Sequence, residues 1–179
     1  MTTLADIDDA SGTTARPESG YAWLRLATSV AIGTIGSVGM WSVVVALPAV
    51  QADFGVARAD ASLPYTLAMI GFGFGAVGIG RLVDRFGIVA PLMLATLVLG
   101  LGFIASGFAP DLTVFALANL VIGIGSSATF APLIADISHW FTRRRGIAVA
   151  ICASGNYFGG AVWPPLVQRL IETVGWRQN

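Results

Sequence analysis

Five long runs without a charged side chain constrain this sequence more than any other feature. Asp, Glu, Lys and Arg are absent from residues 26–52, 61–80, 86–110, 112–135 and 146–168. Each run has at least 20 residues, and about 20 mostly apolar residues suffice for a helix to cross a bilayer. Closed barrels are the other solution in lipid, but their strands alternate in polarity and these runs do not. The runs therefore predict an all-α, polytopic membrane helix bundle.

The charges between the runs set the expected boundaries. We expect helices at about 26–50, 62–82, 88–109, 112–135 and 146–168. Residues 1–23 mix acidic residues with Thr, Ser and Gly and lack the apolar segment of a signal peptide, so they are expected to form a flexible tail. The runs are also rich in glycine, which lets membrane helices approach closely. We expect the glycine faces to serve helix packing.

Arginine sets the expected orientation, because cytoplasmic loops of membrane proteins carry an excess of basic residues. With the N-terminus inside, the cytoplasmic segments hold Arg16, Arg25, Arg81, Arg85, Arg143, Arg144 and Arg145, and the outer ones hold Arg58, Arg169 and Arg177. This distribution predicts a cytoplasmic N-terminus in the inner (plasma) membrane. The net charge of zero provides no field for steering onto nucleic acid, so no nucleic-acid partner is expected.

The turn after the second run reads Gly80-Arg-Leu-Val-Asp84-Arg85-Phe-Gly87. Gly87 permits a tight turn into the next helix. Asp84 can cap a helix N-terminus, and Arg85 can pair with a carboxylate or a helix C-terminus. We expect Asp84 at the cytoplasmic end of the second helix, within bonding distance of a terminus of the third or fourth helix. Simple helix capping is the alternative role for Asp84.

A second turn follows the fourth run and carries His139-Trp-Phe-Thr-Arg143-Arg144-Arg145-Gly146. Asp136 closes the fourth run and faces the three arginines across a short loop, so an ion pair between them is expected to tie the helix ends together. Such pairs contribute little at an interface unless several join in a network. The alternative role for Arg143, Arg144 and Arg145 is anchoring of the topology and contact with anionic lipid.

The two turns together resemble signatures of the major facilitator superfamily. The first matches its G-x-x-x-D-R-x-G loop, and the second, with the helix after it, is similar to bacterial members of the monocarboxylate-porter branch. The resemblance covers about residues 24–179 and implies two six-helix halves around a central cavity. The sequence would then hold five helices of an N-terminal six-helix domain, as a fragment whose second half is missing. The resemblance also implies that Asp84 is the acceptor of a cytoplasmic gate shaped by Gly80, Arg85 and Gly87.

Candidates for a substrate cavity are polar or aromatic side chains inside the runs. An amide in lipid must find a partner or water, so we expect Asn119 and Asn156 to face other helices, as interhelical contacts or substrate contacts. Trp41 and Tyr157 complete the candidate cavity, with plain packing as the alternative for Trp41. None of the runs holds a charge, so no buried ionic site or proton relay is expected within them.

The resemblance implies a secondary active transporter that moves a small solute, such as a monocarboxylate anion, by alternating access. A non-transporting membrane subunit or scaffold and a drug or metabolite exporter are the alternatives. Against the exporter, Asn119 stands where many proton-coupled exporters have Arg, and Gly160 where they have Pro. A single His and a single Cys exclude a Cys/His metal cluster, and neither enzymatic activity nor a cofactor is expected. The expected partners are the lipid bilayer, a small-molecule substrate and the missing second half.

Overall fold

The computed structural model describes residues 19–175, and the regular structure in this range is helical. Its helices form five stretches long and apolar enough to cross a membrane, namely Gly20–Phe54, Arg58–Phe86, Val89–Gly107, Leu112–Trp140 and Arg145–Val174. The predicted all-α bundle with five potential spans is therefore confirmed.

The observed helices extend beyond the charge-free runs at most of their ends. They are α1 (Gly20–Gly36), α2 (Val38–Phe54), α3 (Arg58–Ala61), α4 (Leu63–Phe86), α5 (Val89–Gly107), α6 (Leu112–Ser127), α7 (Ala131–Trp140) and α8 (Arg145–Val174). Helix α1 starts before the expected residue 26, because the Ser19 hydroxyl accepts a hydrogen bond from the N–H of Ala22 at 3.3 Å and caps the helix there. Residues 20–23 thus belong to a span and not to the tail. Residues 1–18 of the expected tail lie outside the described residues.

Two of the five spans are interrupted near their middle, which the runs alone did not predict. The first bends at Ser37, between α1 and α2, where the serine hydroxyl donates to the carbonyl oxygen of Thr34 at 2.8 Å. The fourth unwinds over residues 128–130, between α6 and α7. Pro132 in the first turn of α7 has no N–H to continue a helix from α6. Each of these spans therefore consists of two shorter helices.

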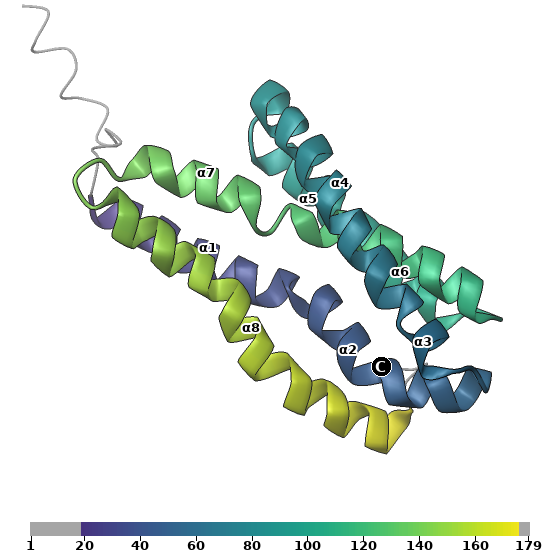
Figure 1. Ribbon diagram of the computed structural model, residues 1–179. Coiled ribbons are helices and arrows are strands. Elements are labelled where there is room, and N and C mark those ends of the chain that lie inside the picture. Colours follow the sequence, from purple (N-terminus) through teal and green to yellow (C-terminus); the bar gives the residue numbers. More distant parts are fainter. Residues whose placement is uncertain (1–18, 176–179) are drawn as a thin grey trace, which may run out of the picture.

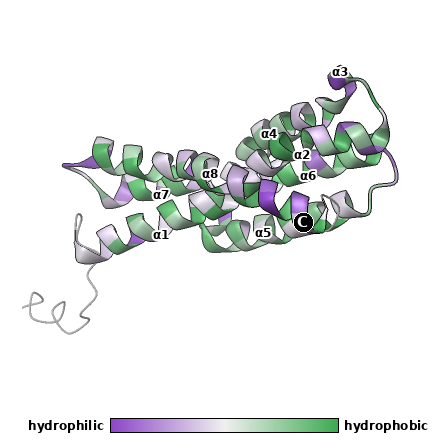
Figure 2. Ribbon diagram, turned by 90° about the horizontal axis from the view of Figure 1, so that it is seen from below, coloured by the Kyte–Doolittle hydropathy of each residue, from purple (hydrophilic) through white to green (hydrophobic). Residues whose placement is uncertain are grey.

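The helices form two groups (Figure 1). Helices α4 and α5 pack on α6, while α1 and α2 pack on α8. Helix α7 continues the span of α6 and contacts α1 and α8 as well as α4, so it links the groups at one end of the bundle. Figure 2 shows hydrophobic residues along most of the helix lengths and hydrophilic ones at the α7–α8 turn and around α3. This distribution fits a bundle whose long axis crosses a bilayer.

Glycine allows the closest helix contacts in the bundle. A Cβ atom on Gly71 of α4 would collide with the carbonyl oxygen of Leu120 in α6, and one on Gly155 of α8 would lie 2.7 Å from the carbonyl oxygen of Val30 in α1. In lipid, such backbone approach replaces the hydrophobic force that holds helices together in water. The expectation that glycine faces serve helix packing is confirmed at these contacts.

Candidate functional site

The two interrupted spans meet near their breaks. A Cβ atom on Gly36 would collide with the side chain of Thr129, and one on Gly39 would lie 2.5 Å from the Ser126 hydroxyl oxygen. That hydroxyl is buried and has no hydrogen-bond partner within residues 19–175. An unsatisfied buried polar group costs about 1–3 kcal/mol. Where the first and fourth spans cross, the helices are thus tightly packed and the Ser126 hydroxyl is left without a hydrogen bond within residues 19–175.

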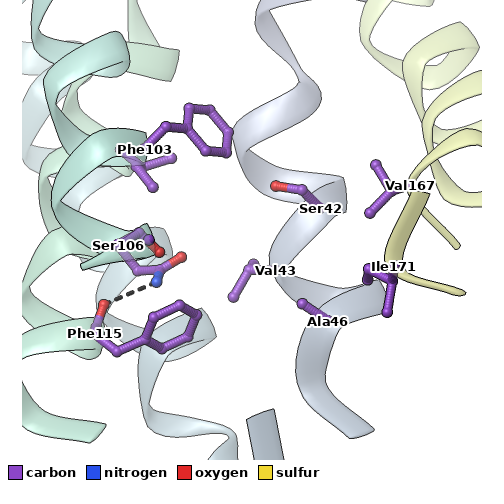
Figure 3. A pocket seen from close by; sticks show the side chains of 11 residues that line it. Ser42, Val43, Ala46, Phe103, Ser106, Phe115, Val167 and Ile171 are labelled. Atoms are coloured by element: carbon purple, nitrogen blue, oxygen red, sulfur yellow. Dashed lines mark hydrogen bonds between the residues drawn. The ribbon is translucent and has the colours of Figure 1, made fainter. Parts of the chain in front are cut away.

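A small cavity lies further along α2 and α6 (Figure 3). Its volume is about 50 Å³. Four helices contribute to its lining, which consists of Ser42, Val43, Ala46, Phe103, Ser106, Gly107, Phe115, Asn119, Ile122, Val167 and Ile171. Ligand pockets usually have about 300–1,000 Å³, whereas one water needs only about 10–15 Å³. In the described bundle this cavity has room for a few waters and not for an organic solute.

Asn119 is the predicted cavity residue that reaches this space. Its side chain is 2% exposed, so the expectation that it faces the protein interior is confirmed. Its amide N–H donates to the carbonyl oxygen of Phe115 at 2.9 Å, drawn as the dashed line in Figure 3. The amide oxygen has no hydrogen-bond partner among the described residues and can accept a bond in the cavity. Ser42 and Ser106 add hydroxyl groups that sequence reasoning missed, because isolated serines in apolar runs serve packing as often as binding.

The other three predicted cavity residues lie elsewhere. The ring N–H of Trp41 donates to the backbone carbonyl oxygen of Asn156 at 3.3 Å, and the same ring covers Gly160. Trp41 therefore packs against α8, as its alternative role required. The side chain of Asn156 is half-buried beside this contact. Tyr157 is 74% exposed and points away from the described bundle, so it does not join Asn119 in one cavity.

Two hydrogen bonds join α8 to α1 next to the bend between α1 and α2. The ring N–H of Trp163 donates to the carbonyl oxygen of Thr34 at 2.6 Å. The Thr34 hydroxyl in turn donates to the carbonyl oxygen of Gly155 at 2.9 Å. A kinked membrane helix needs such partners for the backbone groups that the kink frees. Two hydrogen bonds between α1 and α8 therefore hold the bend in place.

The predicted gate turn closes α4 as expected, but its carboxylate makes no contact there. Gly87 ends the helix with a φ of +76°, a conformation that suits glycine. Asp84 lies exposed in the last turn of α4 and forms no hydrogen bond or ion pair with a residue of the described range. The N-cap of α5 is the apolar Ile88, so Asp84 is not the cap either. The expected contact with a terminus of the third or fourth helix is absent, because the turn leaves Asp84 outside the packed ends.

Asp136 pairs with a different partner from the one expected. Arg25 of α1 donates to it twice, from Nε to Oδ2 at 2.7 Å and from Nη2 to Oδ1 at 2.8 Å. The guanidinium also lies 4.9 Å from the ring centroid of Trp140. Asp136 is one turn inside α7, where it faces α1 and not the predicted arginine loop. The side chains of Arg25 and Asp136 are 29% and 19% exposed, so the ion pair is largely buried. Both residues lie just outside the charge-free runs but within the observed helices.

Arg143 and Arg144 are exposed in the turn between α7 and α8, and Arg145 is exposed as the first residue of α8. Next to them, the buried ring of Phe141 makes an edge-to-face contact with Trp23 of α1 at 5.2 Å. Aromatic residues of this kind favour the membrane–water interface. Arg143, Arg144 and Arg145 therefore lie at the end of the bundle where α7 and α8 are joined. Within residues 19–175, no three His, Cys, Asp or Glu side chains gather as a metal site.

Comparison with known proteins identifies similar sequences. The family model described as Major Facilitator Superfamily matches residues 30–178. "Monocarboxylate transporter 11" of Homo sapiens is 31% identical over 163 residues, which cover 90% of this chain and 34% of that protein. "Monocarboxylate transporter 6" of Mus musculus is 30% identical over 88% of this chain and 34% of its own length. "Probable sulfoacetate transporter SauU" of Cupriavidus necator is 26% identical over 75% of this chain and 31% of its own length. The chain spans about a third of each of these relatives.

Proposed function

Because the chain belongs to the Major Facilitator Superfamily, a family of transporters and not of enzymes, we propose that it is part of a secondary active transporter for a small organic anion such as a monocarboxylate. The chain is a multi-pass membrane protein. Support for the solute class comes from relatives named as monocarboxylate and sulfoacetate transporters. We propose alternating access as the mechanism, with a second half of the transporter completing the solute path.

The lining of the cavity beside Asn119 supports a need for this second half. The cavity is uncharged, and its volume of about 50 Å³ is below that of ordinary ligand pockets. A bound carboxylate requires a cation or strong hydrogen-bond donors. We therefore propose that the second half supplies the countercharge and that Asn119, Ser42 and Ser106 contribute neutral hydrogen bonds.

Uptake by vesicles that contain the full-length parent protein tests this proposal. We expect labelled short monocarboxylates to accumulate, and Asn119→Leu to lower the uptake about five- to tenfold, since it removes one buried hydrogen-bonding group. Gln168→Leu is the matched control, because the Gln168 amide lies exposed on α8, bonded to Glu172. Release instead of uptake would favour the exporter. Lack of transport in both directions would favour the non-transporting scaffold.

We propose that the α4–α5 and α7–α8 turns lie in the cytoplasm, as the excess of arginine in them supports. A single cysteine in a Cys152→Ser background tests this. Ala59→Cys in α3 should react with a membrane-impermeant maleimide in intact cells, whereas Thr142→Cys in the α7–α8 turn should react only after permeabilisation. Both positions are exposed, so accessibility depends on the side of the membrane. The reverse labelling pattern would invert the proposed orientation.

We propose that Asp84 acts as a gate acceptor for a group outside the described residues, with Gly80, Arg85 and Gly87 shaping the turn. The carboxylate is exposed and unpartnered within residues 19–175, so it is free to bind such a group when the cytoplasmic side closes. In the same uptake assay, Asp84→Asn should slow transport while the amount of protein in the membrane stays constant. Asp60→Asn, another exposed acid, is the control and should leave transport unchanged.

A further inference from the structure

The first span and α8 exchange hydrogen bonds through two tryptophan side chains. The ring N–H of Trp163 in α8 donates to the carbonyl oxygen of Thr34 at 2.6 Å. In the opposite direction, the ring N–H of Trp41 in α2 donates to the carbonyl oxygen of Asn156 at 3.3 Å. In each span the acceptor lies about two helical turns before the tryptophan. The two bonds form a reciprocal pair, and we call these four residues the indole clamp.

The indole clamp lies where the backbones of both spans are weakened. The first span bends at Ser37, between the acceptor and the donor that it contributes to the clamp. In α8, Pro164 and Pro165 follow Trp163 directly. A proline has no N–H for the carbonyl four residues before it, and it is a common cause of kinks in helices. Bonds between the two spans therefore contribute to the direction in which each span continues beyond this level.

Glycine brings the two spans into direct contact at the indole clamp. A Cβ atom on Gly159 of α8 would collide with the Ser37 hydroxyl, and one on Gly160 would lie 2.6 Å from the ring of Trp41. Such close approach leaves little room for one span to tilt without the other. The start of α2 is therefore held against α8 by packing as well as by the two indole bonds.

The segments beyond the indole clamp form one side of the cavity that Asn119 lines. This side consists of residues from α2 and from the end of α8, namely Ser42, Val43, Ala46, Val167 and Ile171. Figure 3 shows them across from Phe103, Ser106 and Phe115, which belong to α5 and α6. The position of α2 and α8 relative to α6 therefore sets the width of this cavity.

We propose that Trp163 is a positioning residue of the solute path, which sets the distance between Ser42 and Asn119 by clamping the first span to α8. This inference rests on the proposed function, in which those two side chains contribute neutral hydrogen bonds to the solute. Trp163 makes the shorter bond of the indole clamp and does not line the cavity, so it acts through α2 and not by contact with the solute.

Transport kinetics of the full-length parent protein in vesicles test the role of Trp163. Trp163→Phe keeps an aromatic ring and removes the N–H. We expect the KM for a labelled short monocarboxylate to rise about fivefold, as the loss of one hydrogen bond allows, with an unchanged maximal rate per protein in the membrane. In a Ser42→Ala background the same change should raise the KM little further, because the side chain that Trp163 positions is already absent.

Trp23→Phe is the matched control. The Trp23 ring contacts Phe141, and its N–H makes no hydrogen bond within residues 19–175. We expect this variant to keep the KM and the maximal rate of the unchanged protein.

A distance measurement without solute separates this inference from the proposed function. Nitroxide labels on Val44→Cys in α2 and Leu101→Cys in α5 report the separation of the two sides of the cavity in a Cys152→Ser background. Both labelled side chains are exposed, so the labels need not disturb the packing. We expect Trp163→Phe to broaden or shift the distance distribution, and Trp23→Phe to leave it unchanged.

Three outcomes would overturn the inference. An unchanged distance distribution in Trp163→Phe would show that its bond does not position α2. A lower maximal rate with an unchanged KM would show a structural role alone. An equal rise in KM with and without Ser42→Ala would show that Trp163 does not act through Ser42. Absence of transport by the unchanged protein would contradict the proposed function instead, and the distance distributions would still decide whether the indole clamp positions α2.

Discussion

Replacing Gly71 with alanine is expected to destabilise the bundle by about 2 kcal/mol or more, the range for overpacking a tight contact. The added Cβ would collide with the carbonyl oxygen of Leu120, a backbone atom that cannot rotate away as a side chain does. Helix α4 would have to move off α6, along the most extensive helix contact of the bundle. Denaturation in detergent micelles, followed by circular dichroism, measures the loss.

Gly73→Ala is the matched control on the same helix. A Cβ atom at Gly73 would have no heavy atom within 4 Å, so the change adds helix propensity without a collision. We expect this variant to be as stable as the original or slightly more stable. Equal stability of the two variants would contradict the close α4–α6 approach.

Removal of one partner of the Arg25–Asp136 pair has the second large expected effect. Asp136→Asn leaves the guanidinium half-buried without its countercharge, and Arg25→Gln does the same to the carboxylate. Breaking a fully buried pair costs about 3–5 kcal/mol, and partial exposure of both side chains reduces the expected cost to about 2 kcal/mol. The same denaturation assay should show it, together with loosening of α1 from α7.

The double variant separates the pair from other roles of the two residues. If the contact carries the effect, Arg25→Gln with Asp136→Asn should cost less than the sum of the single changes. Arg143→Gln removes an exposed arginine and should change stability by less than about 0.5 kcal/mol. A large loss with Arg143→Gln, or strict additivity of the two single changes, would argue against the observed pairing.

The membrane spans could be predicted from sequence because charge is so costly in lipid that its absence over 20 residues has few other causes. The interruptions could not, since a bend at Ser37 depends on bonds that α8 supplies from far along the chain. Pro132 was a local signal for the break between α6 and α7, because proline is common at the start of a helix. To predict the break from Pro132, one also has to notice that the charge-free run continues on both sides of it.

The candidate site was predictable where burial alone decides a side chain's position. Asn119 faces the interior because its amide requires a partner in lipid. Tyr157 follows Asn156 directly on α8, and adjacent residues of a helix point about 100° apart, so the two could not both face the bent first span. The partner of Asp136 was missed because loop proximity suggested the nearby arginines. Arg25 and Asp136 do border charge-free runs assigned to the same side of the membrane, which was a usable signal.

The Arg25–Asp136 pair also has a consequence for biogenesis. The two residues are 111 positions apart, and ribosomes add about 5–20 residues per second. Asp136 is therefore added to the chain on the order of 10 s after Arg25. Its place near the start of α1 allows the long side chain to reach the headgroup region in the meantime. The first span can thus enter the membrane alone. When the fourth span arrives, Arg25 replaces its contact with lipid or water by the ion pair with Asp136, and this pair fixes the position of the first span.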